Sequence, residues 1–404
     1  MGDIRAFASK TRRAESMRVL QVYDFAPELE GPTEGVGLAI LQLSQALSSL
    51  GNEVWILGGM GRRRERVGRA GDVVIRRADR FGLMRRTWSP SNLSFSRQIL
   101  FPPIVMSQRD LLKEISSFDV VHGHVYSAGF VALRIGALLD VPVCNTIHGS
   151  YYEVWDRIAN PRLAPVIRFA ERRIVSYLAR NVDCQIHTDR FFADMVRSWG
   201  VDHDRLRVIH NGVTDELLNN YTEPAHRDIP MFFTARRLVL KNGVDFLLKA
   251  FAIVLRQRKA ILRIAGGGPE YENLLALADR LQIRNSVEFL GVISHDRIPQ
   301  FIGSGTVGVL PSLAEASSLF LLECMAIGRP VVCSAAGGIT EIVDSQTAWM
   351  VRPGDERSLA DGMIQSIDQW DDSVSKARKA HKQAEQRHSW SGVARRTIEC
   401  YRRS

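Results

Sequence analysis

The sequence predicts an α/β protein with two domains, each a parallel sheet covered by helices. The chain has 404 residues and an apolar content of 45%, which is enough for two domains with separate hydrophobic cores. Short apolar runs alternate with longer segments of helical periodicity in both halves of the chain. This alternation favours parallel sheets, because consecutive parallel strands need a crossover connection that is usually a helix.

The predicted elements follow the same alternation in both halves. In the first half we predict strands at 18–23, 53–57, 119–122 and 141–147 and helices at 36–50 and 128–139. In the second half we predict strands at 231–234, 261–265, 287–290, 307–310 and 330–333 and helices at 243–256, 271–281 and 319–326. Residues 372–404 are predicted to form one or two polar helices.

The domain boundary is predicted within 212–230, a polar stretch that contains two prolines. We expect an N-terminal extension at 1–16, a first Rossmann-like domain at 17–215, a second at 216–385, and a C-terminal helix at 386–404 that packs back on the first domain. Open parallel sheets bind ligands at the carboxyl ends of their strands. Two facing domains therefore predict a cleft in which each domain holds one substrate.

Composition disfavours several classes of protein. No apolar run approaches the roughly 20 residues needed to cross a bilayer, and residues 1–16 lack the apolar segment of a secretory signal. The five cysteines are widely spaced and form no C-x-x-C pair, which disfavours a disulfide framework or a zinc site. These features predict a cytoplasmic protein.

The net charge of +9 includes a dense arginine-rich stretch from Arg62 to Arg86. Such a stretch suits an anionic membrane surface or an acidic acceptor, but it fits a solvated loop equally well. We expect peripheral contact with the inner face of a membrane as one use of it. Nucleic acid is not expected as a partner, because no aromatic-interleaved sheet or recognition helix accompanies the arginines.

The segment 311–332 carries the most chemical information, because an acidic loop runs there into an apolar helix. Ser317 and Ser318 are candidate N-cap residues, and the free N–H groups of a helix start can hold a diphosphate without a metal. Glu323 lies about one turn inside the helix, where its carboxylate can accept hydrogen bonds from a ribose diol. Glu315 precedes the helix and can reach hydroxyls of a sugar beyond the phosphates.

Two other interpretations of Glu315 and Glu323 stay open. Both could be solvent-facing charges, although the apolar run before Glu323 counts against this. They could also form the carboxylate pair of a glycosidase, whose members lie roughly 5–10 Å apart. Eight residues of helix span about 12 Å, so this alternative is the weaker one.

With these residues the sequence resembles the retaining glycosyltransferases of family 4, which have the GT-B fold of two Rossmann-like domains facing across a cleft. The resemblance covers most of the chain, and its most specific part is the E-x7-E signature of Glu315 and Glu323. It implies that Glu315 contacts the donor sugar and that Glu323 contacts the ribose. It also implies that the backbone near Ser318, Leu319 and Phe320 contacts phosphate.

Other blocks of the chain are similar to the same family. Residues 208–213 and 235–245 resemble its V-I-P-N-G-V and G-R-L-V-x-x-K-G-V-D blocks, which implies that Asn211 binds substrate and that Arg237 neutralises the departing diphosphate. Asn242 occupies the position of the family's lysine, so we expect Lys241 to serve instead, since cations stabilise the leaving group. Gly267 lies in a G-x-G-P-like loop, a pattern that alone predicts only a turn.

In the first domain, Gly35 and Gly37 resemble the family's glycine pair between the first strand and its helix, where the backbone approaches the donor phosphates and the acceptor. His148 lies in a T-x-H-G block and is expected to hydrogen-bond the transferred sugar. His122 and His124 match the family's V-V-H-x-H. Alternate strand residues face the same side, so this pair could ligate a metal. No third ligand is evident, however, and strand-end packing is the other interpretation.

The resemblance implies transfer of a hexose, with retention, from a UDP- or GDP-sugar to a hydroxyl of a glycan, lipid-linked or small-molecule acceptor. The expected setting is the synthesis of glycans, glycolipids or cell-envelope polysaccharides, with no metal and no cofactor beyond the donor. The alternatives are a non-catalytic nucleotide-sugar or carbohydrate-binding protein, a nucleotide-sugar epimerase and a phosphorylase. Residues 315–318 depart from the family's frequent E-G-F-G, which leaves the identity of the sugar open.

Overall fold

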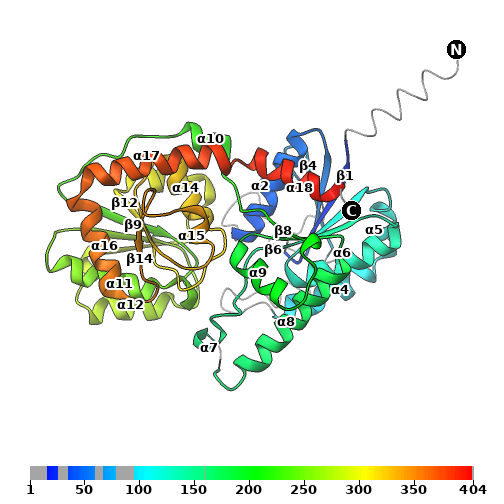
Figure 1. Cartoon of the computed structure of the whole chain (residues 1–404), viewed down its shortest axis with the longest axis horizontal. Helices are drawn as coiled ribbons and strands as arrows, with labels where there is room; N and C mark the ends of the chain where they lie inside the picture. Colours follow the sequence, from blue (N-terminus) through cyan, green and yellow to red (C-terminus); the bar gives the residue numbers. More distant parts are fainter. Residues whose placement is uncertain (1–15, 26–34, 60–66, 79–94, 159, 403–404) are drawn as a thin grey trace, which may run out of the picture.

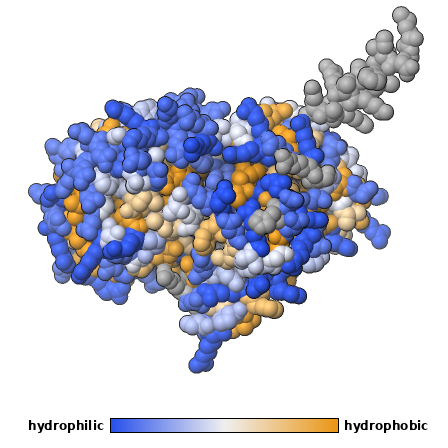
Figure 2. All heavy atoms as spheres, viewed as in Figure 1, coloured by the Kyte–Doolittle hydropathy of each residue, from blue (hydrophilic) through white to orange (hydrophobic). Residues whose placement is uncertain are grey.

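A computed structural model describes residues 16–25, 35–59, 67–78, 95–158 and 160–402. Two α/β domains lie side by side, and the chain passes from the first to the second and then returns (Figure 1). The surface is hydrophilic over most of the face shown in Figure 2, with hydrophobic residues exposed in scattered patches.

The first domain contains an eight-stranded sheet with the order β3-β4-β2-β1-β5-β6-β7-β8. All neighbouring strands are parallel except β3 and β4. Its strands are β1 (Arg18–Tyr23), β2 (Glu53–Gly58), β3 (Val67–Ala70), β4 (Val73–Arg77), β5 (Val120–His124), β6 (Val143–Ile147), β7 (Cys184–His187) and β8 (Leu206–Val208). Every residue of β5, β6 and β7 is buried, as expected for parallel strands with helices on both faces.

The second domain contains a six-stranded parallel sheet with the order β11-β10-β9-β12-β13-β14. Its strands are β9 (Met231–Ala235), β10 (Ile261–Ala265), β11 (Val287–Gly291), β12 (Val307–Leu310), β13 (Val331–Ser334) and β14 (Trp349–Val351). The chain starts in the middle of the sheet, winds to one edge, and then restarts beside its first strand. This is the doubly wound order of a Rossmann fold, which reverses direction at the boundary between β9 and β12.

Helices cover both sheets. The helices of the first domain are α2 (Gly35–Ser49), α4 (Phe95–Met106), α5 (Arg109–Glu114), α6 (Val125–Leu139), α7 (Trp155–Ile158), α8 (Ala164–Asn181) and α9 (Arg190–Ser198). The later helices are α10 (Asp215–Asn219), α11 (Val244–Leu255), α12 (Tyr271–Arg280), α13 (Ile298–Ser304), α14 (Leu319–Ile327), α15 (Ile339–Ile342), α16 (Glu356–Asp368), α17 (Trp370–Arg387) and α18 (Trp390–Arg402).

The elements predicted from the sequence are present, with ends that shift by up to three residues. One difference concerns the site: the family resemblance places Gly35 and Gly37 between the first strand and its helix, whereas α2 begins at Gly35 and includes both glycines. Both glycines therefore lie in the first turn of the helix. Glycine disfavours a helix interior through its backbone entropy, but the first turn is tolerant because its N–H groups have no intrahelical partner.

Helix α17 runs along the second domain, and α18 continues from it onto the first domain (Figure 1). Trp390 and Tyr401 of α18 are buried in the same hydrophobic cluster as residues of β1 and α2. The indole of Trp390 also donates a hydrogen bond to Gln42 Oε1 at 2.8 Å.

The two connections between the domains meet at one point. Val213, in the forward connection, pairs with Ser389, in the return connection, as a parallel β-bridge. Val213 N–H donates to the carbonyl of His388 at 2.7 Å, and Trp390 N–H donates to the carbonyl of Val213 at 3.1 Å. The two passages of the chain are therefore hydrogen-bonded to each other.

Candidate active site

A buried ion pair lies where the second sheet reverses its winding direction. Arg236 follows β9 and Glu315 follows β12, and Arg236 Nη2 lies 2.5 Å from Glu315 Oε2. Their side chains are only 6% and 13% exposed. Ligands in open parallel sheets bind at this switch point, so Glu315 lies where the fold places a substrate. The interpretation of Glu315 as a solvent-facing charge is thereby excluded.

The charge of Glu315 is stabilised by its neighbours. Burial acts to raise the pKa of this carboxyl, but the positive charges of Lys241 and Arg236 outweigh it and hold the pKa below its usual value. Lys241 also lies 5.3 Å from the ring centroid of Tyr151 in the first domain. The lysine expected from the sequence is therefore close to Glu315 and at the junction of the domains.

Arg236 is a site residue that the sequence analysis missed, because the resemblance pointed to its neighbour Arg237. The Arg236 side chain reaches Glu315, while Arg237 is exposed. Asn242, at the position of the family's lysine, is buried and accepts a hydrogen bond from Arg236 at 3.1 Å while donating to the Arg237 carbonyl at 2.6 Å. The signal available in the sequence was the doublet of arginines directly after the predicted strand, either of which could turn toward the site.

A pair of glycines supports the loop that carries Glu315. Gly338 N–H donates to the carbonyl of Glu315 at 2.9 Å. Gly337 has φ +49°, and a Cβ there would lie 2.4 Å from the same carbonyl oxygen. A side chain at Gly337 would therefore displace the Glu315 loop, which explains why glycine is needed at this position.

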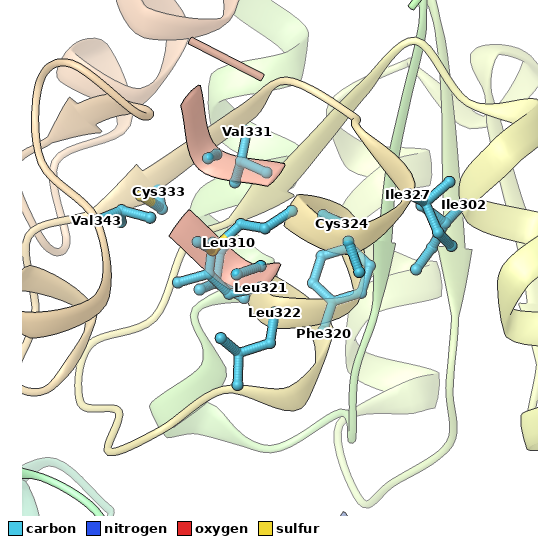
Figure 3. Packing of buried hydrophobic residues seen from close by; sticks show 14 of the residues in the cluster. Ile302, Leu310, Phe320, Leu321, Leu322, Cys324, Ile327, Val331, Cys333 and Val343 are labelled. Carbon is cyan, nitrogen blue, oxygen red and sulfur yellow. The ribbon is translucent and has the colours of Figure 1, made fainter. Parts of the chain in front are cut away.

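Helix α14 begins directly after this loop, at the position predicted from the sequence. Ser318 is its N-cap, and its Oγ accepts the N–H of Leu321 at 3.3 Å. Leu319 and Phe320 are the first residues of the helix. Figure 3 shows Phe320 and its neighbours packed among buried side chains of β12, β13 and α13. The buried apolar side chains of α14 thus fix the position of its N-terminus, whose N–H groups face the loop that carries Glu315.

Glu323 lies inside α14 and is buried, so it too is no surface charge. Its Oε1 lies 3.0 Å from His295 Nε2, in the segment between β11 and α13. Burial acts to lower the pKa of His295, but the hydrogen bond and charge of Glu323 outweigh it and raise that pKa. His295 is a second residue that the sequence analysis missed, since no motif marks it.

The first domain contributes three neighbouring histidines at the ends of β5 and β6: His122 and His124 are buried, and His148 is half-buried. His148 Nε2 lies 2.9 Å from His124 Nδ1. Burial lowers the pKa of His148 to about 4 and the pKa of His122 to about 3, so these rings are neutral. Within the part of the chain that the structure describes, no group of three or more His, Cys, Asp or Glu side chains is placed to hold a metal ion.

The wall of the first domain beside the site is held by a buried acid that the sequence analysis did not single out. Glu171 of α8 accepts hydrogen bonds from Tyr126, Ser150 and Trp155 at 2.6–2.7 Å. These donors come from α6 and from the residues that follow β6. Glu171 therefore fixes the segment after His148 against the body of the first domain.

Several contacts join the two domains beside Glu315. Asn211 donates its side-chain N–H to the carbonyl of Ser317 at 2.8 Å, and its backbone N–H donates to Ser317 Oγ at 2.9 Å. Glu341 accepts hydrogen bonds from the N–H groups of Arg190 and Phe191 and lies 2.8 Å from His210 Nε2. The backbone N–H and the side-chain NH₂ of Asn211 thus form hydrogen bonds across the junction between the domains.

A cavity of about 40 Å³ lies at this junction. Its wall comes from both domains and includes Tyr152, Asp189, Glu315 and Gly337. Pockets that hold small molecules commonly measure about 300–1,000 Å³. This cavity by itself is therefore too small to hold a nucleotide sugar.

The remaining glycines of the predicted site have different surroundings. The carbonyl of Gly267 accepts the N–H of Leu238 at 2.9 Å, so the loop after β10 supports the loop after β9. Gly35 has open space where a Cβ would be, and Gly37 is buried in the first turn of α2.

Most of the arginine-rich stretch 62–86 lies outside the described residues. Of its described members, Arg76 forms an ion pair with Glu114 at 2.9 Å, and Arg77 is buried. Only Arg69 of these three is exposed. None of the described helices combines the length and apolar composition needed to cross a bilayer.

Two family models match the chain on either side of the connection between the domains. The model described as Glycosyltransferase Family 4 matches residues 33–217, and the model described as Glycosyl transferases group 1 matches residues 222–387. The chain belongs to the family 4 glycosyltransferases. It is therefore an enzyme of the glycosyltransferase class, and the predicted family is confirmed.

Named relatives align with nearly the whole chain. It is 26% identical to the phosphatidylinositol N-acetylglucosaminyltransferase gpi3 subunit of Schizosaccharomyces pombe, over 91% of this chain and 77% of that protein. It is 25% identical to D-inositol 3-phosphate glycosyltransferase 2 of Catenulispora acidiphila, over 93% of this chain and 91% of that protein.

Solved structures share the fold. The sucrose-phosphate synthase of Thermosynechococcus elongatus superposes with a TM-score of 0.81 at 18% identity, covering 96% of this glycosyltransferase and 98% of the synthase. HepE of Anabaena, solved in complex with UDP-glucose, gives a TM-score of 0.72 at 17% identity, covering 95% and 98%. The predicted GT-B fold of two facing Rossmann-like domains is confirmed.

The buried neutral histidines predict acid sensitivity. The pKa of His122 is about 3 in the folded protein and about 6.5 in an unfolded chain. Below pH 6.5 protons therefore bind the unfolded chain preferentially, so stability is lost as the pH falls. Between pH 6.5 and 4 His122 alone contributes a loss of about 3 kcal/mol. Urea unfolding at several pH values should show that the free energy of unfolding depends less steeply on pH in His122→Gln than in the wild type. The matched control is His226→Gln, because His226 is exposed, and equal pH slopes for both variants would contradict the prediction.

The two adjacent arginines should differ in their effect on transfer. Arg236→Ala leaves Glu315 with one cation fewer in a buried site, so we expect kcat/KM to fall about 100-fold, the scale found when one charge-stabilising group is removed. Arg237→Ala is the matched variant, and its kcat/KM should fall less than that of Arg236→Ala. Thermal unfolding of both variants controls for loss of fold. A larger loss in Arg237→Ala would show that the neighbour predicted from the sequence carries the role.

Proposed function

We propose that this glycosyltransferase transfers a hexose from a UDP- or GDP-sugar to a hydroxyl of an acceptor, with retention of anomeric configuration. The expected acceptors are a growing glycan, a lipid-linked sugar or a small molecule in the synthesis of glycans, glycolipids or envelope polysaccharides. The observation that carries the proposal is the cluster of Glu315, Arg236 and Lys241 beside the N-terminus of α14.

We propose that the donor binds along one continuous segment of the chain, from Glu315 through the start of α14 to Glu323. The start of α14 faces the diphosphate with free N–H groups and a partial positive charge. Glu323, one turn further on, takes the ribose hydroxyls, while Glu315 takes hydroxyls of the hexose. The diphosphate gains negative charge as it leaves, and Lys241 and Arg236 stabilise that charge in a buried site. These cations perform the task that a divalent metal performs elsewhere, so the proposal includes no metal or other cofactor.

We propose that the reaction proceeds with retention and without a covalent intermediate on the enzyme. Arg236 and, at 3.3 Å, Ser312 Oγ both donate to Oε2 of Glu315, so this oxygen serves to position the carboxylate. In the proposed reaction the diphosphate leaves first and draws the proton of the acceptor hydroxyl, which then attacks from the same face. His148 contributes a hydrogen bond to the transferred sugar.

The relatives support a nucleotide-linked hexose. HepE was solved with UDP-glucose, and the Schizosaccharomyces pombe relative is named for transfer of N-acetylglucosamine. Binding without catalysis and epimerisation of the donor remain the competing functions. Both are distinguished by product analysis: a binding protein yields no product, and an epimerase converts the donor when no acceptor is present.

We also propose that the enzyme works in the cytoplasm, in peripheral contact with an anionic membrane. The arginine-rich stretch 62–86 motivated this expectation, and α8 adds a second observation. Leu163, Val166 and Phe169 at its start are 55%, 64% and 66% exposed. Arg162, just before the helix, and Arg173, four residues after Phe169, are also exposed. Exposed apolar side chains beside arginines suit a lipid surface with negative headgroups.

Transfer and its stereochemistry can be measured together. UDP- and GDP-hexoses are first screened for thermal stabilisation, since a ligand of the native state raises its stability. The stabilising donor is then incubated with candidate acceptors, and NMR of the product should show the anomeric configuration of the donor. Glu323→Gln should weaken donor binding, with Glu356→Gln as control because Glu356 lies in α16, outside the site. Inversion of configuration would refute the retaining mechanism.

Membrane contact can be tested by flotation with vesicles. Phe169→Glu places a negative charge on the exposed face of α8, so binding to vesicles with 30% phosphatidylserine should fall about fivefold or more, since each nearby charge contributes about 1 kcal/mol. Leu138→Glu is the matched control, because Leu138 is 60% exposed on α6. Equal binding of the two variants would place the membrane contact elsewhere.

A further inference from the structure

A continuous network of buried side chains connects the C-terminal helix to His148. His148 Nε2 lies 2.9 Å from His124 Nδ1, and His124 Nε2 lies 2.5 Å from Gln21 Oε1. Gln21 Nε2 donates to the hydroxyl of Tyr401 at 3.1 Å. The members come from β1, β5, the end of β6 and α18, so the network lies across the switch point between β1 and β5.

Tyr401 also bonds a second branch of the network. Its hydroxyl lies 2.7 Å from His122 Nδ1, and His122 Nε2 lies 2.7 Å from Thr146 Oγ1. The hydroxyl thus accepts from Gln21 and donates to His122. The rings of His122 and His124 are stacked with centroids 4.3 Å apart. Among the described residues, the Tyr401 hydroxyl is hydrogen-bonded to both branches.

The orientation of Gln21 determines where the proton on each ring lies. Because Gln21 donates to Tyr401, its Oε1 faces His124, and an oxygen there requires a proton on His124 Nε2. His124 is neutral, since burial and the neighbouring rings hold its pKa well below the ordinary value. Its Nδ1 is therefore an acceptor and takes the Nε2–H of His148. The tautomer of His148 follows from the bonds of its partners.

This arrangement of protons makes Nδ1 of His148 a hydrogen-bond acceptor. With the proton on Nε2, the Nδ1 of His148 carries a lone pair, and this buried atom has no hydrogen-bond partner among the described residues. The next residue, Gly149, approaches Ala316 of the Glu315 loop so closely that a Cβ on it would lie 3.3 Å from the Ala316 Cβ. The residue after His148 therefore lies beside the Glu315 loop, and His148 Nδ1 is an unsatisfied acceptor one residue from this junction.

We propose that Tyr401 is a positioning residue for transfer: through Gln21 and His124 it fixes His148 as the tautomer that accepts a hydrogen bond from a sugar hydroxyl. The inference rests on the proposed function in that the hydroxyl belongs to the transferred hexose. Tyr401 touches no substrate. Its effect passes through three intervening hydrogen bonds, and it depends on α18 being docked on the first domain.

Removal of the Tyr401 hydroxyl should release Gln21. In Tyr401→Phe the Gln21 amide loses its acceptor and can rotate, so that its NH₂ faces His124 and the protons on His124 and His148 move to the opposite nitrogens. The matched control is Thr397→Val, which removes one buried hydroxyl from the same helix. Among the described residues, Thr397 Oγ1 donates to the carbonyl of Val393, at 2.9 Å, and it is not a member of the network.

The experiment records ¹⁵N–¹H correlation spectra of histidine-labelled enzyme, with the His148 signals assigned from His148→Gln. The wild type and Thr397→Val should show His148 protonated on Nε2, and Tyr401→Phe should show the other tautomer or a mixture. In the same samples kcat should fall about tenfold in Tyr401→Phe and stay within twofold in the control. If Tyr401→Phe does not fold, Gln21→Met interrupts the same path and should give the same spectral change.

The outcomes separate this inference from the proposed function. An unchanged His148 spectrum in Tyr401→Phe overturns the inference, as does a changed spectrum with normal kcat. A wild-type enzyme that transfers no sugar from any donor overturns the proposed function, while the spectra still test the path from Tyr401 to His148. A tautomer change together with the tenfold loss supports both.

Discussion

The geometry of the candidate site depends on one buried ion pair, between Arg236 after β9 and Glu315 after β12. Burying either charge alone would cost several kcal/mol, so each side chain requires the other, and the loops that carry them are held together at the switch point. The glycines at 337 and 338, the side chain of Asn242 and the capped start of α14 all support this pairing. A donor that enters the site meets groups whose positions are already set, which limits reorganisation during the reaction.

The two domains have different kinds of polar side chain at their switch points. The second domain places full charges at its switch point, and cations hold the pKa of Glu315 low. The first domain places neutral histidines at its own switch point, with the pKa of His148 lowered to about 4 by burial. One side is therefore suited to stabilising a charged leaving group. The other is suited to directional hydrogen bonds with uncharged hydroxyls.

Sequence reasoning succeeded where local chemistry determines the structure. The apolar strands β1, β10 and β12 and the N-cap at Ser318 follow from patterns within a few residues. It missed β7, because the buried run Cys184–His187 contains Gln and His, whose burial depends on partners from elsewhere in the fold. Arg236 and His295 were missed for a related reason. Which arginine of the doublet turns inward, and which loop reaches Glu323, is decided by tertiary packing that no local pattern records.

The bridge between Val213 and Ser389 joins the two covalent passages between the domains at a single place. The polar contacts between the domains lie close to this bridge. Asn211, two residues before Val213, donates to Ser317, and the ring of His210, the partner of Glu341, lies 5.9 Å from the ring of His388. The backbone segment 210–213 therefore has two tasks at once: it carries the chain from one domain to the other, and it holds the loop of Glu315 and Ser317 in place.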